Sequence, residues 1–412
     1  MLQKSNDNNN AIVARIKNLR KHPNADRLQI GTILGNSVVV DLSLKNEDLI
    51  IYFDSNLRLS PTYLHYNNLY SSKEMNANPE AKGYFGKNGR VRAQKFRGEM
   101  SNGYVAEINS LCGVIPEGLY DLDENDEFTH INGVEICSKY IAPIKGYQGQ
   151  VGKSSKPISE MFRKHWDTKQ LMRELDSIPE DSVLYIEEKI HGTSGRTGNV
   201  LCNTNRPWWK FWAPKWEWKI VSGTRRVDNI NNHIPQVREE IERRVAAHLY
   251  KGETIYYEID GYDIDGSPIQ KGHNRVYSYG CRPGEFRAML YRVTITTLDG
   301  FSYDLNRKQV YKRAEELGLE KSYLIYRIPM DWDGFWKFNF EKNKDEFDWE
   351  VLVLGLAKGK SHLDAGTLLE GIVVWFEDKN GNWTCLKHKS EEFLLDQDQC
   401  MEKEEGDVED VL

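Results

Sequence analysis

The first third of the chain alternates short apolar runs with polar breaks. The runs that read as strands occupy residues 11–16, 28–34, 36–42, 48–53, 90–96 and 102–108. They are rich in β-branched residues and are separated by Asn, Gly and Asp, which is typical of strands joined by tight turns. No long amphipathic pattern interrupts them, so residues 1–145 are predicted to form a small closed β-barrel.

The pattern changes after residue 145. Residues 146–157 are rich in Gly, Ser and Lys and predict a linker, and residues 158–178 show apolar positions at helical spacing, with Ser159 as a possible cap. From residue 181 to about 395, strand patterns mix with two clear helical patterns, at 234–250 and 307–318. The chain is therefore predicted to be an α+β protein whose second domain combines sheets with flanking helices.

The charge of the chain is concentrated at its C-terminal end. The net charge is −7, but residues 391–412 carry ten acidic side chains and one lysine, which leaves residues 1–390 with a net charge of about +2. Residues 396–412 are predicted to be a solvated or disordered acidic tail. Such a tail could instead screen a basic groove, and charge alone does not decide between the two.

Composition excludes several classes of protein. No run of about 18 apolar residues is present, and the polar N-terminus lacks the apolar core of a signal peptide, so a cytoplasmic location and no membrane partner are expected. The six cysteines are scattered without a C-x-x-C pair, which argues against a zinc ribbon and a disulfide framework.

Five of the eleven tryptophans fall in one short segment, WWKFWAPKWEWK, residues 208–219. Aromatic and lysine residues alternate around Pro214, which suggests a hairpin or an insertion. The segment could be a hydrophobic plug packed on its domain, or a platform on which nucleic-acid bases stack beside phosphate-binding lysines.

A lysine ends the apolar strand pattern LYIEEKIHGTS, residues 184–194. Lys189 is followed three residues later by Gly192, which lets the backbone approach a ligand without a Cβ clash. K-x-x-G alone is a weak pattern, since a surface lysine at a loop is commoner than a nucleophile. Its weight comes from the segments that follow it in order.

Downstream of Lys189 come VSGTRR (221–226), YYEIDG (256–261), MLYRVTI (289–295), LLEGIVV (368–374) and LKHK (386–389). From about residue 181 to 390 the chain resembles the lysine-dependent nucleotidyltransferases, the superfamily of ATP-dependent ligases and mRNA-capping enzymes. An E-G pair before an apolar strand, followed 17 residues later by K-x-K, is the most specific part of the resemblance.

The resemblance implies a role for each of these positions. Lys189 would be the nucleophile; it must lose a proton from an amine whose usual pKa is ~10.4, and burial, neighbouring cations or a metal would lower that value. Catalytic roles are also expected for Glu258, Glu370, Lys387 and Lys389. The expected ATP- or AMP-binding residues are Glu187, Glu188, Lys189, Ile190, Gly192, Arg196, Arg225, Glu258, Tyr291, Glu370, Lys387 and Lys389, with Arg226 as a further phosphate donor.

A hydrated Mg²⁺ or Mn²⁺ is implied as well, held mostly through water by Glu370, Glu258 and His191. His191 marks a departure from the superfamily pattern, because members often carry Asp two residues after the nucleophile. A histidine supplies no negative charge, so metal binding would depend on the two glutamates, with Glu188 as a further candidate. The spacing between Lys189 and Arg225 is also stretched, by the Trp-rich segment.

The N-terminal part narrows the resemblance. Residues 21–33, KHPNADRLQIGTI, resemble the opening of tRNA-binding OB modules, whereas only 23 residues follow Lys389. An OB barrel before the catalytic domain resembles the ATP-dependent RNA ligases with an N-terminal OB domain. Such enzymes imply a lysyl-AMP intermediate, an adenylylated RNA 5′ end and sealing of 3′-OH/5′-phosphate ends, on nicked duplexes or tRNA-like ends. A monomer is expected, which a phage could encode for action in a host cytoplasm.

A basic segment in the predicted barrel fits an RNA-binding role. Residues 82–97 contain no acidic residue and interleave basic with aromatic side chains. A solvated basic hairpin is the alternative. The predicted RNA-binding residues are Lys87, Arg90, Arg92, Lys95 and Arg97.

Three other functions remain open at this point. A DNA ligase or general nick sealer would share the same motifs, and a decayed ligase domain could serve as a non-catalytic RNA-binding protein. The intact Lys189, Glu370 and Lys387 speak against decay. A capping enzyme is disfavoured because its C-terminal OB domain would be missing.

Overall fold

The computed structural model describes residues 1–5, 9–115, 122–141, 158–179, 182–225, 228, 235–328 and 349–409. The chain divides into two compact units, which are described separately. The first unit comprises Met1–Lys145, Asp348–Leu356 and Ser390–Leu412, and the second comprises Gly146–Phe347 and Ala357–Lys389.

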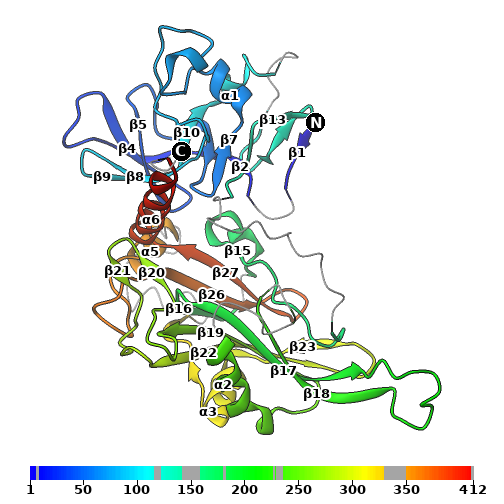
Figure 1. Ribbon diagram of the computed structural model, residues 1–412. Coiled ribbons are helices and arrows are strands. Elements are labelled where there is room, and N and C mark those ends of the chain that lie inside the picture. The colour runs from blue at the N-terminus through cyan, green and yellow to red at the C-terminus, as the bar shows by residue number, and fades with distance from the viewer. Residues whose placement is uncertain are drawn as a thin grey trace. The chain divides into compact units, whose positions relative to one another are not determined.

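Short strands outnumber helices in the described part of the first unit (Figure 1). Every apolar run predicted there as a strand contains one. The strands are β1 (Leu2–Gln3), β2 (Ala11–Arg15), β3 (Lys17–Lys21), β4 (Leu28–Ile33), β5 (Asn36–Asp41), β6 (Leu49–Phe53), β7 (Leu57–Leu59), β8 (Ala93–Phe96), β9 (Glu99–Asn102), β10 (Tyr104–Glu107), β11 (Glu127–Phe128), β12 (His130–Ile131), β13 (Val134–Glu135) and β14 (Cys137–Lys139).

These strands pair in several separate sheets. Among the described residues the sheet orders are β10-β6-β2-β11, β3-β4-β5, β1-β12-β13, β14-β7 and β8-β9. A core that includes Val13 and Ile51 packs against the first of these sheets, and a second core that includes Ile33 and Val38 packs against β3-β4-β5. The pairing gives no closed barrel within these residues, so the predicted barrel, and with it the OB module, is not confirmed.

The first unit also contains helices α1 (Pro61–Tyr66), α5 (Trp349–Leu356) and α6 (Glu391–Glu409), and 3₁₀ turns η1 (Lys73–Met75) and η2 (Ile108–Leu111). Helix α6 spans much of the acidic segment predicted as a tail. Phe393 on it is buried, and Asp398 accepts hydrogen bonds from the Arg90 guanidinium and the Ala93 N–H on the first unit. These described contacts fix the first half of α6 to its own unit.

The second unit consists of two larger sheets (Figure 1). The first has the order β15-β27-β26-β16-β25, formed by Lys169–Gln170, Trp383–Lys389, Gly371–Glu377, Leu184–Lys189 and Leu324–Ile328. The second has the order β18-β17-β19-β22-β23, formed by Trp216–Gly223, Thr193–Asn203, Glu253–Gly261, Phe286–Thr296 and Ser302–Asp304, with β24 (Glu320–Lys321) also on β22. A small hairpin joins β20 (Lys271–Gly272) to β21 (Arg275–Val276).

Helices cover one face of the second sheet. The two predicted helices are confirmed as α2 (Pro235–Val245) and α3 (Arg307–Leu317), and η5 (Ala246–His248) follows α2. Alternation along β19 points Ile255, Tyr257 and Ile259 into the core with these helices, because successive side chains of a strand face opposite sides. Glu258 therefore faces the other side, toward the first sheet.

The segment 158–179 differs from its prediction. Helical spacing predicts one or two helices there, but the described residues form β15 and two 3₁₀ turns, η3 (Leu171–Arg173) and η4 (Leu175–Ser177). Strand β15 pairs in parallel with Leu386 and Lys387 of β27, and this tertiary pairing replaces the helix.

No helix within the described residues is both long and apolar enough to span a membrane.

Candidate active site

A pocket of about 310 Å³ lies between the two sheets of the second unit, with Lys189 in its wall. Strand register explains how residues far apart in the sequence reach it. Lys189 lies opposite Gly371, which lies opposite Lys389; two residues along, Glu187, Val373 and Lys387 form the next row. Because strand side chains alternate between faces, both rows face the pocket.

The second sheet supplies the opposite wall in the same way. Ser194 on β17 pairs with Glu258 on β19, and Glu258 pairs with Met289 on β22. All three line the pocket. The Ser194 hydroxyl donates to Oε2 of Glu258 over 2.8 Å, which fixes the carboxylate in position.

Lys189 is held by a buried carboxylate. Its Nζ lies 2.9 Å from Oε1 of Glu370, and the Lys389 Nζ lies 3.9 Å from the same oxygen. Burial lowers the pKa of Lys189, but the carboxylates of Glu370 and Glu258 outweigh it and raise the pKa above its usual value. Burial raises the pKa of Glu370, and Lys189, the His191 ring and Lys389 together lower it below its usual value. Lys189 is therefore an ammonium ion paired with a carboxylate.

The pKa of the neighbouring Lys387 shifts in the opposite direction from that of Lys189. Burial, together with the charges of Lys189, Lys389 and Arg225, lowers the pKa of Lys387 to about 8. Arg225 lines the pocket and donates from Nη2 to Asp167 over 2.6 Å. The pocket thus gathers four basic side chains, a concentration of positive charge that suits a polyphosphate.

Glu258 is the second buried carboxyl of the pocket. Burial raises its pKa to about 7, although Lys189 and the Ser194 hydrogen bond act to lower it. Near neutral pH this group is therefore divided between its acid and carboxylate forms. It can donate or accept a hydrogen bond, as a sugar hydroxyl requires.

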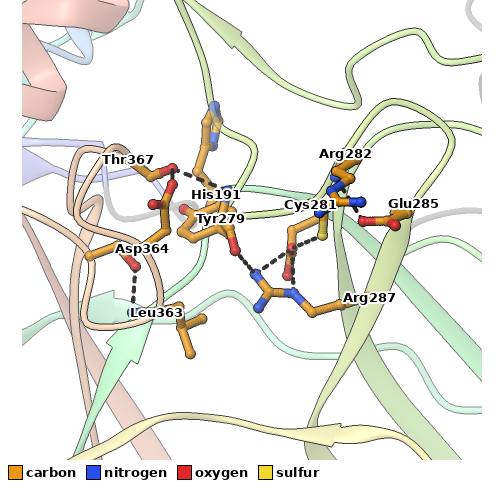
Figure 2. Close-up of polar contacts among 11 residues, drawn as sticks. His191, Tyr279, Cys281, Arg282, Glu285, Arg287, Leu363, Asp364 and Thr367 are labelled. Carbon is orange, nitrogen blue, oxygen red and sulfur yellow. Dashed lines mark hydrogen bonds and ion pairs between the residues drawn. The ribbon is translucent and has the colours of Figure 1, made fainter.

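The loop after Lys189 is anchored by Tyr279 (Figure 2). The His191 N–H donates to the Tyr279 hydroxyl over 2.7 Å, and the Tyr279 N–H donates to Thr367 Oγ1 over 3.1 Å. A Cβ at Gly192 would lie 2.2 Å from the Ile259 carbonyl oxygen, so only glycine fits there. The His191 ring packs edge-on against Tyr277, and its Nδ1 lies 3.8 Å from Oε2 of Glu370.

Two glutamates predicted to bind nucleotide are engaged with the protein. Glu187 is buried and bonded to the Arg307 guanidinium and the Tyr311 hydroxyl. Oε2 of Glu188 accepts from the His362 N–H over 2.8 Å. Both residues line the pocket, but the Glu187 carboxylate serves to hold Arg307, which in turn donates to the Tyr291 carbonyl oxygen.

The structure brings most of the predicted nucleotide-binding residues together. The predicted residues that line the pocket are Glu187, Glu188, Lys189, Ile190, His191, Gly192, Arg225, Glu258, Tyr291, Glu370, Lys387 and Lys389. Arg196 is the exception, because its side chain is buried in an ion pair with Asp228 and stacks over the Phe162 ring. Arg226 lies outside the described residues.

Sequence reasoning missed eight lining residues: His165, Thr168, Ser194, Met289, Ser322, Val373, Trp375 and Cys385. His165 packs edge-on against Tyr291, with ring centroids 5.3 Å apart. Burial and the charges of Arg292, Arg225 and Lys387 lower its pKa well below the usual value, so it is a neutral ring. Trp375 follows from the alternation of β26, whereas nothing in the sequence pattern pointed to His165.

The basic residues predicted to bind RNA lie in the first unit and are not equivalent. Lys87, Lys95 and Arg97 are exposed and Arg92 is half-buried. The Arg90 side chain is fully buried in its ion pair with Asp398 of α6. The first three are therefore available to a ligand, whereas Arg90 is committed to α6.

The carboxyl groups of the pocket suit a divalent cation that keeps most of its water ligands better than a cation bound only by protein atoms. Within the described ranges, no three His, Cys, Asp or Glu side chains converge as a metal-binding group. Oε2 of Glu370 is nevertheless buried and accepts no hydrogen bond, which is the kind of oxygen that a cation or its water would use. Glu258 provides a second carboxyl on the facing sheet.

The pairing of Lys189 with Glu370 makes a testable prediction about pH. Glu370→Gln removes the charge that raises the Lys189 pKa, so the pKa should fall by about 1 to 3 units. Isotope-coded acylation of Lys189 over a pH series, read by mass spectrometry, measures it. Glu377→Gln, at the exposed end of the same strand, should leave the midpoint unchanged. An unchanged midpoint in Glu370→Gln would show that the carboxylate does not control Lys189.

We compared the chain with known protein families, curated sequences and solved structures. No protein-family model matches the chain, and no curated protein matches its sequence. The chain is similar in structure to the RNA ligase of Naegleria gruberi. A substituted form with ATP and Mn gives a TM-score of 0.58 at 15% identity, covering 93% of this chain and 98% of that chain.

Two further structures of that ligase agree. The form with PPi gives 0.55 at 16% identity, and a substituted form with AMP and Mn gives 0.56 at 15% identity; each covers 93% of this chain and 97% of that chain. The chain has the fold of an RNA ligase. Because the likeness extends over both units, the RNA-ligase fold includes the first unit as well as the pocket.

Proposed function

We propose that the protein is an ATP-dependent RNA ligase that carries AMP on Lys189. One observation supports this above all. A lysine paired with a buried glutamate stands in a pocket with three further cations, in a chain with the fold of an RNA ligase that has been solved with ATP, AMP and PPi.

The reaction would take place in three steps. The neutral amine of Lys189 attacks the α-phosphorus of ATP, the N–P bond forms, and the P–O bond to pyrophosphate breaks. An oxygen of the RNA 5′-phosphate then displaces the lysine from phosphorus, which restores the amine and leaves AMP on the RNA end. The RNA 3′-OH finally attacks that end, forms the phosphodiester and releases AMP. The first and third steps each release one proton, from the lysine amine and from the 3′-OH, and the second step takes up one proton, which the lysine nitrogen needs to leave as an amine.

The other pocket residues fit roles around that nucleophile. Lys387, Lys389 and Arg225 would hold the phosphates and balance their charge. Tyr291 and Trp375 offer rings for the purine, and Glu258 suits the ribose hydroxyls.

Glu370 and Glu258, with His191 nearby, are the residues that would hold Mg²⁺ or Mn²⁺, mostly through water. When bound, such a cation would supply positive charge to the triphosphate. The Glu370 carboxylate pairs with Lys189 and favours its ammonium form, so the neutral amine requires that this pairing be weakened.

In the first unit, exposed Lys87, Lys95 and Arg97 would contact the RNA backbone, with Arg92 beside them. We propose this unit as the OB-type module of the ligase. Arg90 is left out of the proposed contact, because its charge is already balanced by Asp398.

Nick sealing tests the proposed function. A duplex with a single 3′-OH/5′-phosphate break should be joined with ATP and Mg²⁺ or Mn²⁺ when the 3′-OH strand is RNA, and much more slowly when it is DNA. Equal joining would indicate a general nick sealer, faster joining of DNA a DNA ligase, and RNA binding without joining a non-catalytic protein. GTP in place of ATP should give no joining.

A further inference from the structure

The hairpin between β17 and β18 carries an exposed aromatic surface that the pocket does not use. Trp208 is 86% exposed, Phe211 76% and Trp212 71%, and Trp209 is more than half exposed. Burying these side chains would be favourable by about 1.5–3 kcal/mol each, so a surface of this kind marks a binding site. The hydrophobic-plug interpretation is wrong for the tip, because its rings are exposed, whereas Trp218 at the base of the hairpin packs on the core near Val200.

The tip is an ordered turn. The Lys210 N–H donates to the Pro207 carbonyl and the Ala213 N–H to the Lys210 carbonyl, each over 3.0 Å. Arg206 donates from Nη1 to the Lys210 carbonyl over 2.9 Å, and the Thr204 N–H donates to the Lys215 carbonyl over 3.0 Å. These turns leave the aromatic rings exposed in two neighbouring pairs, Trp208 with Trp209 and Phe211 with Trp212, each in edge-on contact.

The charge around the rings indicates the partner. Residues 204–219 contain four basic side chains and a single acidic one, Glu217, which pairs with Lys219. Lys210 and Lys215 are exposed among the rings. Aromatic faces beside free cations match a ligand with stacking faces and a phosphate backbone, which is single-stranded nucleic acid. Bases inside a duplex are already stacked and would not reach the rings.

We infer that this hairpin tip, residues 204–215, is a second RNA-binding site that holds unpaired nucleotides of the ligase substrate away from the joining site. The inference rests on the proposed function for the choice of RNA. Strand β17 runs from Ser194 at the pocket to Asn203, nine residues or about 30 Å in extended chain. The tip projects beyond that point (Figure 1), so it would contact RNA well away from the reacting ends.

Binding of a short fluorescein-labelled oligouridylate to the full-length protein tests the inference. The double variant Trp208→Ala, Trp212→Ala should bind at least about tenfold more weakly, and Lys210→Ala with Lys215→Ala should reduce the salt dependence by about one to two released counterions. Phe301→Ala, which removes another well-exposed ring from the same sheet, is the matched control and should bind as wild type. Lys189 labelling by [α-³²P]ATP should be unchanged in all variants.

Other results would each contradict a stated part of the inference or of the proposed function. If the Trp variant binds the oligouridylate as tightly as wild type, the hairpin is not a site for unpaired RNA. The same follows if the wild-type protein binds fully paired RNA but not unpaired RNA. Binding to phosphatidylserine vesicles that depends on Trp208 and Trp212, with RNA affinity intact, would assign the surface to a membrane. If wild-type protein is never labelled by ATP but RNA binding still depends on the hairpin, the ligase proposal fails while the hairpin site stands.

Discussion

Lys189→Ala should abolish labelling of the protein by [α-³²P]ATP, because no other group in the pocket is proposed to form the bond to AMP. The nucleophile is the Nζ atom, and alanine has no counterpart. Denaturing electrophoresis after incubation with ATP and Mg²⁺ or Mn²⁺ measures the result directly. The band should fall to background, whereas Lys379→Ala, an exposed lysine in the turn between β26 and β27, should label as wild type.

The same variant should retain the last step of the reaction. RNA supplied with AMP already on its 5′ end bypasses Lys189 as a nucleophile, so Lys189→Ala should still join it. This separates loss of the nucleophile from loss of the fold. A labelled band that persists in Lys189→Ala, or failure on both substrates by a protein with a normal thermal transition, would contradict the assignment.

Glu187→Ala should destabilise the protein severely. The substitution leaves the Arg307 guanidinium buried without its carboxylate, and the loss of one partner of a buried ion pair costs about 3–5 kcal/mol. Urea denaturation should show this as a lower midpoint. Glu315→Ala, which removes an exposed partner of Lys321 from the same helix α3, should change the midpoint little.

A second variant sharpens this test. Replacing both partners, as Glu187→Leu with Arg307→Met, leaves no uncompensated charge and should recover much of the lost stability. If Glu187→Ala alone hardly changes the urea midpoint, the ion pair does not stabilise the wall of the pocket. Glu187 would then again be a candidate nucleotide-binding residue.

The sequence predicted which residues line the pocket better than it predicted the contacts that support them. Lys189, Glu258, Glu370 and Lys387 come together because ordered motifs lie at matching positions on adjacent strands. Alternation from Val373 also places Trp375 in the same wall, so that residue was recoverable from period-two spacing.

Other parts depend on contacts that no local pattern contains. Glu187 was predicted to bind nucleotide, but its partner Arg307 lies 120 residues away on α3. His165 falls in a segment with helical spacing, and the pairing of β15 with β27 overrides that propensity. Arg90 was predicted to bind RNA because its local sequence is basic, whereas Asp398, 308 residues later, balances its charge.

The closed barrel is not confirmed in the described residues, and the reason is related. The strand patterns of the first unit were correct, yet a pattern of apolar and polar positions fixes which face of a strand is buried and leaves open which edge it pairs with. The described strands of that unit pair in several short sheets, and β8 and β9 form a separate hairpin.

The most direct test of the central claim is to identify the residue to which AMP becomes attached. Lys387 and Lys389 line the same pocket as Lys189, and burial with neighbouring cations lowers the pKa of Lys387 to about 8, so the measurement must tell the three lysines apart. Wild-type protein incubated with ATP and Mg²⁺ should be digested and mapped by mass spectrometry. We predict one AMP, in phosphoramide linkage, on Lys189. AMP on Lys387 or Lys389, or no covalent AMP on any lysine, would contradict the account.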